Sequence, residues 1–224
     1  MKEFIKNHPW IMVWVAIAFV GVLISSIFTG QHFLLVLPLF NSLIIMLLTS
    51  SINRYGQLLG GINSIVYGCV YIYFGLYGMA ATTILVNAPI MIVTFILWNK
   101  KSYKHSTLLK RLSKKQRAIG LVLLLCLMLG SFVVLKLINP DGHILLDTAI
   151  SVIGWVVTLL TLFAYIEAYP LNVINCSLNL ILFGIMTADD IKQLPYLIYS
   201  GYSTVMVIRS CFMSTKLYAE QHSK

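Results

Sequence analysis

The sequence predicts an all-α membrane protein with eight transmembrane helices, and three observations favour this fold class. Of its 224 residues, 59% are hydrophobic and only 10% are charged, whereas soluble domains carry about 25% charged residues. The mean hydropathy is +0.88, and the apolar residues fall into eight runs that are long enough to cross a bilayer. The basic residues gather in the connections that would lie on one side of the membrane.

In chain order, we expect an additional N-terminal helix and then two three-helix repeats joined by a linker helix, a 3+1+3 plan. The expected spans are residues 9–29, 33–50, 56–75, 80–98, 118–138, 147–165, 170–187 and 195–213. They divide the chain into an N-terminal tail with the additional helix (1–32), a first repeat (33–98), a basic loop (99–117), the linker helix (118–138), a second repeat (147–213) and a tail (214–224).

The two repeats align at an offset of 112 residues. This offset places "GINSIV" (61–66) over "VINCSL" (173–178) and Asn63 over Asn175. Two three-helix units in parallel orientation need one helix between them, because that helix returns the chain to the starting side. Parallel repeats of this kind are a known transporter design, and the substrate site lies at their interface.

The basic residues set the orientation of the chain. Residues 99–117 hold eight Lys or Arg, and eight spans would place this loop beside Arg54 and both termini. That side carries 14 of the 16 positive charges, so the positive-inside rule predicts that both termini are cytoplasmic. Topology explains the net charge of +9, and the absence of any base-reading motif argues against a nucleic-acid partner.

The positions of the ionisable residues exclude several function classes. All seven acids and all five histidines fall in loops, in tails or at span ends, which disfavours ion-coupled transport. No histidine or carboxylate pairs with a nucleophile within a span, so we expect no enzyme activity. The four cysteines lack CxxC spacing, and we expect neither a metal site nor a cofactor.

Neutral amides and phenols are the polar groups inside the predicted spans. Asn63 and Tyr67 lie four residues apart on one helix face, and Asn172, Asn175 and Asn179 share a face of another helix. Amides and flat rings suit a neutral, hydrogen-bonding ligand. The alternative is that these amides only bridge helices, an interaction of about 0.6 kcal/mol on average.

Tyrosines near the end of the third span receive a different interpretation. Tyr71, Tyr73 and Tyr77 are expected in an interfacial aromatic belt. Pro89 lies mid-span, where a proline frees a backbone carbonyl, so we regard it as a hinge candidate.

Two stretches of the sequence resemble a known family. Residues 56–101 contain Asn63, Tyr67, "LYG", the central Pro89 and a "WNKK" end, and they resemble the first half of the PnuC-type vitamin transporters, the nicotinamide riboside transporter family. The segment "YIEAYPLNVINCSLN" (165–179) is similar to a part of the second half in which a glutamate is followed by aromatic and polar residues. Glu167 and Tyr169 fit that pattern. The resemblance covers about residues 33–214.

The resemblance implies a fold similar to SWEET sugar transporters, a homotrimer and a bacterial inner-membrane location among membrane lipids. It also implies passive uptake of a vitamin or nucleoside-like solute, which a cytoplasmic kinase then traps. Nicotinamide riboside is the family default. The sequence departs from the family at Met91, where the family often has glutamine, and at Asn172, where it tends to have tryptophan. Loss of an indole and gain of an amide at Asn172 would suit a ligand with more hydrogen-bonding groups along its edge, such as a deoxynucleoside.

The sequence therefore predicts a facilitator that works by alternating access. The alternatives are a transporter of a deoxynucleoside or of another B vitamin (thiamine or riboflavin), and a membrane sensor or scaffold that transports nothing. We expect substrate contacts from Asn63, Tyr67, Asn87, Tyr169, Asn172, Asn175, Asn179 and Tyr199.

Overall fold

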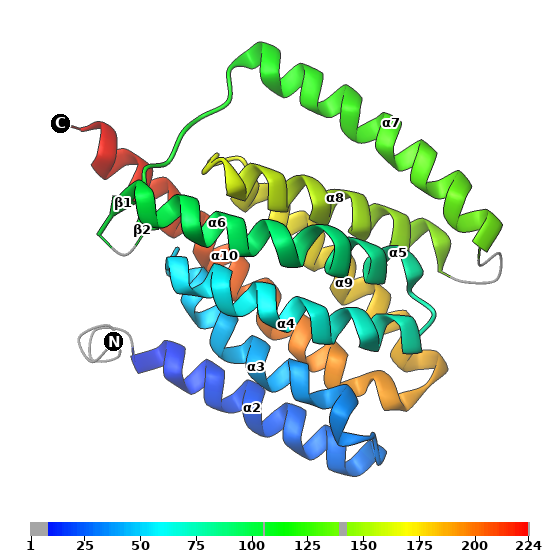
Figure 1. Ribbon diagram of the computed structural model, residues 1–224. Helices are drawn as coiled ribbons and strands as arrows, with labels where there is room; N and C mark the ends of the chain where they lie inside the picture. The colour runs from blue at the N-terminus through cyan, green and yellow to red at the C-terminus, as the bar shows by residue number, and fades with distance from the viewer. Residues whose placement is uncertain (1–8, 105, 139–142, 224) are drawn as a thin grey trace.

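The computed structural model describes residues 9–104, 106–138 and 143–223, and the structural statements below concern these residues. Long helices dominate this part of the chain (Figure 1). They are α2 (Pro9–Thr29), α3 (Phe33–Ser50), α4 (Arg54–Tyr73), α5 (Tyr77–Ala81), the π-helix η1 (Thr82–Asn87), α6 (Ala88–Lys100), α7 (Lys114–Ile138), α8 (Ile144–Leu162), α9 (Ala168–Asp189), the 3₁₀ turn η2 (Ile191–Gln193) and α10 (Leu194–His222). Two short strands, β1 (Ser102–Tyr103) and β2 (Ser106–Thr107), form a hairpin.

The all-α fold class is confirmed, and each predicted span falls on one helical rod. Six rods in the described residues are long and apolar enough to cross a membrane: α2, α3, the continuous α5–η1–α6 rod, α7, α8 and α9. Helices α4 and α10 are not among them. Their polar residues, such as Asn63 in α4 and Arg209 in α10, dilute the apolar run. The count of eight spans therefore stays a prediction.

A closed ring is formed by α3, α4, the α5–α6 rod, α8, α9 and α10. Helix α4 lies between α3 and α6, and α9 lies between α8 and α10; contacts of α6 with α8 and of α10 with α3 close the ring. Helices α2 and α7 lie outside it on opposite edges (Figure 1). The first packs on α10 and α3, and the second packs on α8 and the start of the α5–α6 rod.

Two turns of the same kind end α3 and α8. Ile52 and Ala164 both have a left-handed backbone, with φ of 53° and 60°, a conformation that L-residues rarely adopt. In each turn the left-handed residue donates its N–H to the carbonyl three positions earlier. The residue that follows it donates its N–H to the carbonyl five positions earlier. All four hydrogen bonds are 2.9–3.0 Å long. The two residues are 112 positions apart, so the backbone repeats at the offset found in the sequence.

Pro89 and a row of glycines shape the contact between α4 and the α5–α6 rod. Proline has no N–H and its ring clashes with the carbonyl four residues earlier, and the helix widens into the π-turn η1 just before Pro89. A Cβ on Gly61 would lie 3.0 Å from the Ala88 carbonyl oxygen, and one on Gly68 would lie 2.1 Å from Ile84 Cγ1. Glycine at these positions lets the two rods approach closely.

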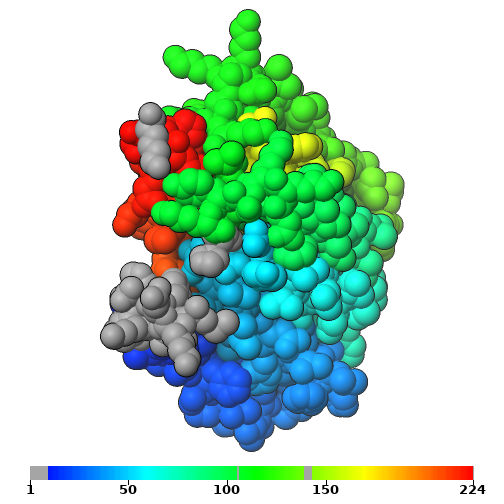
Figure 2. All heavy atoms as spheres, turned by 60° about the vertical axis from the view of Figure 1, so that its left-hand side comes forward, coloured from blue at the N-terminus to red at the C-terminus, as the bar shows by residue number. Residues whose placement is uncertain are grey.

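The connection between the halves is bound along most of its length rather than loose. Lys110 pairs in parallel with Tyr165 in the α8–α9 turn through backbone bonds of 2.8 and 2.9 Å. Gln221 near the end of α10 donates to the Thr107 carbonyl at 3.0 Å and accepts from Leu109 N at 2.8 Å. In Figure 2, the green connection lies against the red end of α10.

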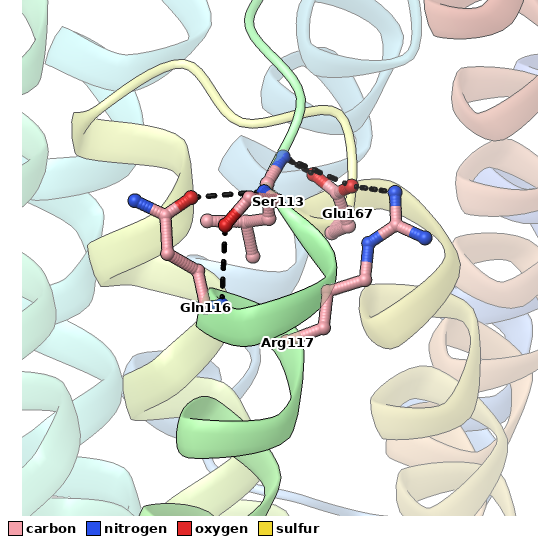
Figure 3. A network of polar contacts seen from close by, with 5 residues as sticks. Ser113, Gln116, Arg117 and Glu167 are labelled. Atoms are coloured by element: carbon pink, nitrogen blue, oxygen red, sulfur yellow. Dashed lines mark hydrogen bonds and ion pairs between the residues drawn. The ribbon is translucent and has the colours of Figure 1, made fainter.

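Glu167 fixes the start of α7 on this connection (Figure 3). Its carboxylate pairs with Arg117 at 2.7 Å and accepts from the backbone N–H of Leu112 at 3.2 Å. Ser113 and Gln116 cap α7 reciprocally: Ser113 N donates to the Gln116 side chain at 2.9 Å, and Gln116 N donates to Ser113 Oγ at 3.3 Å. Glu167, noted in the sequence only for its family resemblance, therefore has a structural role here.

Candidate functional site

A polar cavity lies inside the ring, between α4, η1, α8 and α9. Its volume accessible to water is about 90 Å³, below the ~300–1,000 Å³ typical of small-ligand sites. It is lined by Tyr71, Met79, Thr82, Thr83, Asn87, Ile150, Ser151, Gly154, Asn175 and Asn179. The described lining residues include no charged side chain, so the cavity offers neutral hydrogen-bonding groups and an aromatic ring.

Asn175 and Asn179 come from one face of α9. Asn179 Nδ2 donates to the backbone carbonyl of Asn175 at 3.0 Å, one turn earlier. The side-chain oxygen of Asn175 is buried and has no hydrogen-bond partner among the described residues. A buried acceptor without a partner is costly, so this oxygen marks a position where a ligand donor would be favourable.

Asn87 reaches the cavity from η1 on the other side. Thr158 Oγ1 in α8 lies 2.7 Å from Asn87 Oδ1 and 2.8 Å from the Gly154 carbonyl, and its single proton serves one of these acceptors at a time. The contact connects the first half of the chain to the second beside the cavity. The π-turn that accompanies Pro89 carries Asn87 at its last position.

Asn63 is placed differently from its counterpart Asn175. Its amide nitrogen donates to the Pro38 carbonyl at 3.0 Å and to Ser42 Oγ at 2.8 Å. Its side-chain oxygen accepts from Asn41 at 3.4 Å. Asn63 therefore joins α4 to α3, which matches the bridging alternative, and it is absent from the cavity lining.

Tyr67 and Tyr199 form a row of rings that leads away from the cavity. Tyr67 stacks on the cavity residue Tyr71, with centroids 5.6 Å apart, and lies 6.3 Å from the ring of Tyr199 in α10. The Tyr67 hydroxyl is buried without a hydrogen-bond partner in the described part of the chain. Both phenols thus lie behind the cavity wall.

The remaining predicted residues lie elsewhere. Tyr169 is buried in a cluster with Ile52, Trp98 and Ala164, where the two left-handed turns meet. Asn172 Oδ1 lies 3.9 Å from Cys176 Sγ, and Asn172 does not line the cavity. Of the eight residues predicted to contact substrate, the structure brings Asn87, Asn175 and Asn179 together around the cavity.

The sequence interpretation missed several lining residues. Tyr71, expected in an interfacial belt, instead lines the cavity, and its four-residue spacing from Tyr67 was the signal that could have indicated this. Thr82, Thr83 and Ser151 gave no usable signal, because threonine and serine are common in apolar helices without contacting a ligand.

Ser151 connects the cavity to a buried acid. It donates to Asp147 Oδ1 at 3.2 Å, one turn earlier in α8. The Asp147 carboxylate also accepts the backbone N–H groups of Gly78 and Met79 at 3.1 and 2.9 Å. It therefore satisfies free N–H groups at the start of the α5–α6 rod, a position where negative charge is favoured.

Apolar helices around an uncharged polar cavity define a multi-pass membrane protein of the solute-transporter class. The sequence model of the nicotinamide mononucleotide transporter family matches residues 32–219, and the chain belongs to this family. The resemblance to PnuC-type vitamin transporters is thereby confirmed.

A solved structure shares the fold. The crystal structure of the vitamin B3 transporter PnuC is similar with a TM-score of 0.77 and 20% sequence identity, over 95% of this chain and 92% of that one. At this identity the likeness establishes the fold alone. No curated protein sequence matches the chain.

Proposed function

We propose that the protein takes up a small neutral or weakly charged vitamin- or nucleoside-like solute by facilitated diffusion, with nicotinamide riboside as the first candidate. The observation that carries this proposal is the cavity with Asn87, Asn175 and Asn179 on its walls and an unpaired amide oxygen inside it. Such groups suit the amide and hydroxyls of a riboside, and Tyr71 offers a ring for its heterocycle. A kinase in the cytoplasm would then trap the solute.

The proposed mechanism is alternating access between two three-helix units of a 3+1+3 fold. The cavity lies where the α5–α6 rod of the first unit meets α8 and α9 of the second, as expected for a site between parallel repeats. The contact between Asn87 and Thr158 crosses this boundary, and Pro89 with its π-turn is the proposed hinge. The basic connection after α6 supports cytoplasmic termini in a bacterial inner membrane.

A deoxynucleoside or another B vitamin, such as thiamine or riboflavin, is the second candidate solute. The row of amides on α9 supports it, since Asn175 and Asn179 line the cavity and Asn172 continues the same face. Such a row provides several donors and acceptors for a base edge. A sensor or scaffold without transport activity would instead use these amides only to join helices.

We also propose a homotrimer embedded in lipid. Among the described elements, helix α7 packs mainly on α8 and more weakly on the start of the α5–α6 rod. It exposes many large apolar residues, for example Leu121, Leu129 and Leu137. This surface supports contact with lipid tails or with a neighbouring copy.

Thermal unfolding of the purified protein with nicotinamide riboside, deoxynucleosides, thiamine and riboflavin tests the proposal. A ligand at 100 times its Kd stabilises by about 2.7 kcal/mol, so we expect a clear rise in Tm with one of these solutes. Asn175→Leu should abolish this rise, whereas Asn41→Leu, an exposed amide outside the cavity, should preserve it. No rise with any solute, or the same rise in Asn175→Leu, would contradict the proposed transport site.

A further inference from the structure

The cavity occupies only one side of the ring. Residues 112 positions apart occupy equivalent places in the two halves, as the turns at Ile52 and Ala164 show. Three cavity residues have larger counterparts on the opposite side: Gly154 corresponds to Ser42, Asn179 to Tyr67, and Asn87 to Tyr199. The same backbone therefore encloses space on one side of the ring and side chains on the other.

The first of these exchanges removes a hydrogen-bond partner that Asn63 has and Asn175 lacks. In the first half, Ser42 Oγ lies 2.8 Å from Asn63 Nδ2 and closes the contact between α3 and α4. In the second half Gly154 has no side chain, and a Cβ placed on it would lie 3.3 Å from Asn175 Nδ2. The amide nitrogen of Asn175 thus faces the position of its missing partner. Its amide oxygen is unpaired because Ile153 stands where Asn41 donates to Asn63 Oδ1 in the first half.

The other two exchanges fill the counterpart space with rings. Tyr67 and Tyr199 have centroids 6.3 Å apart, and Tyr67 also stacks on Tyr71 at 5.6 Å. Since Tyr71 lines the cavity, Tyr67 stands directly behind its wall and Tyr199 lies beyond Tyr67. If asparagine occupied both positions, as it does at their counterparts on the cavity side, the cavity would extend to the other side of the ring.

We propose that Tyr67 and Tyr199 limit the size of the solute by filling one side of the ring, whereas their counterparts Asn179 and Asn87 leave space on the other side. The inference rests on the proposed transport function. The rings then confine the solute to the side of the ring that holds Asn87, Asn175 and Asn179, which suits one small heterocycle with a sugar and excludes a three-ring flavin. Tyr67 and Tyr199 are in this sense specificity-determining residues.

Exchanging residues between the two halves tests this inference. In the double variant Tyr67→Asn/Tyr199→Asn, we expect binding of riboflavin with a Kd at least tenfold lower than in the unmodified protein. In the reverse variant Asn179→Tyr, we expect loss of nicotinamide riboside binding, because a phenol fills the cavity. Tyr73→Asn on the same helix, whose tyrosine is 70% exposed, is the control and should behave as the unmodified protein.

Binding is measured by thermal shift and by isothermal calorimetry, with size-exclusion chromatography as the check for folding. If the double variant does not fold, Tyr199→Asn alone is tested for the same gain of riboflavin binding. One result would overturn the inference but not the proposed function: the unmodified protein binds nicotinamide riboside, and a folded variant shows no gain of riboflavin binding. Binding of riboflavin by the unmodified protein as tightly as nicotinamide riboside would also overturn the inference, and absence of binding of any solute would overturn both.

Discussion

Asp147 in α8 accepts the backbone N–H of Met79 at 2.9 Å, so an acid of the second half caps the first turn of a helix in the first half. The same carboxylate accepts from Gly78 N at 3.1 Å, and Asp147 is only 6% exposed. This contact joins the two halves at the end of the ring where the α5–α6 rod begins.

Removing this cap should destabilise the protein. We expect Asp147→Ala to lower the free energy of unfolding by about 1–3 kcal/mol, because two backbone N–H groups lose a charged acceptor in a buried place. Asp147→Asn keeps one acceptor oxygen and should cost less. Thermal unfolding in detergent measures both, with Asp189→Ala as the control, since that side chain is 69% exposed. An unchanged Tm in Asp147→Ala would show that the cap contributes nothing to stability.

Asn63 and Asn175 should respond differently to the same substitution. Asn63→Leu removes hydrogen bonds to Pro38, Ser42 and Asn41 and should reduce stability by about 0.6–1.7 kcal/mol, the range measured for such bonds in membranes. Asn175→Leu removes an unpaired acceptor and should leave stability nearly unchanged while abolishing solute binding. Unfolding and solute-binding measurements on both variants separate the two effects. If Asn63→Leu lost solute binding and kept its free energy of unfolding, Asn63 would be a binding residue and not a bridge between helices.

A glycine at the left-handed position of the α8–α9 turn should stabilise the protein. Ala164 has φ of 60°, which costs an L-residue about 1–2 kcal/mol. Because glycine avoids this cost but has more freedom when unfolded, we expect a net gain of about 0.5–1 kcal/mol for Ala164→Gly. Ala168→Gly, in the first turn of α9, should instead cost about 0.5–1 kcal/mol. A lower Tm for Ala164→Gly would mean that its buried methyl group outweighs the backbone strain.

The hairpin of the connection should detach from α10 in acid. Lys104 pairs with Glu220 at 3.0 Å; this hydrogen bond lowers the pKa of Glu220 from 4.5 and raises the pKa of Lys104 from 10.5. A lowered carboxyl pKa contributes stability above the unfolded-state pKa, and this is lost as pH falls through the folded-state pKa. The raised lysine pKa contributes below its unfolded-state value, and this is lost as pH rises through the folded-state pKa. The ion pair between Lys104 and Glu220 therefore contributes stability at pH values between the titration range of Glu220 and that of Lys104.

Hydrogen–deuterium exchange of residues 101–107, corrected for the intrinsic effect of pH, measures this detachment. We expect faster exchange below the titration range of Glu220 and in high salt, which screens an exposed pair. Glu220→Gln should show the faster exchange already at pH 7 and little further change in acid. Equal exchange in both proteins at every pH would mean that the other contacts of the connection hold the hairpin alone.

Periodicity and length predicted the helices well, because an apolar run bounded by polar residues defines a membrane helix. The predicted spans 9–29 and 33–50 coincide with α2 and α3. The π-turn η1 was not predicted, since Pro89 indicates a local break without specifying its form. The hairpin and the pairing of Lys110 with Tyr165 depend on residues that approach only after folding, and no local pattern encodes them.

The site was predictable only in part, for a specific reason. Asn63 and Asn175 have similar sequence surroundings, and both satisfy the same helix-face argument. What separates them is the two residues 22 and 21 positions earlier, Asn41 and Ser42 in one half and Ile153 and Gly154 in the other. This difference becomes meaningful only when the helices are placed side by side. The offset of 112 residues contained the information, but the comparison had to extend to the neighbouring helix.

The docked connection has a consequence for how the chain can be divided. Residues 107–112 bond to the α8–α9 turn and to the end of α10, all of which follow them in sequence. A backbone cut beside Lys101 would therefore leave these bonds within the second fragment. Two separately encoded polypeptides meeting at that point could assemble through the packing of α6 on α8 and α3 on α10, in the manner of a split protein.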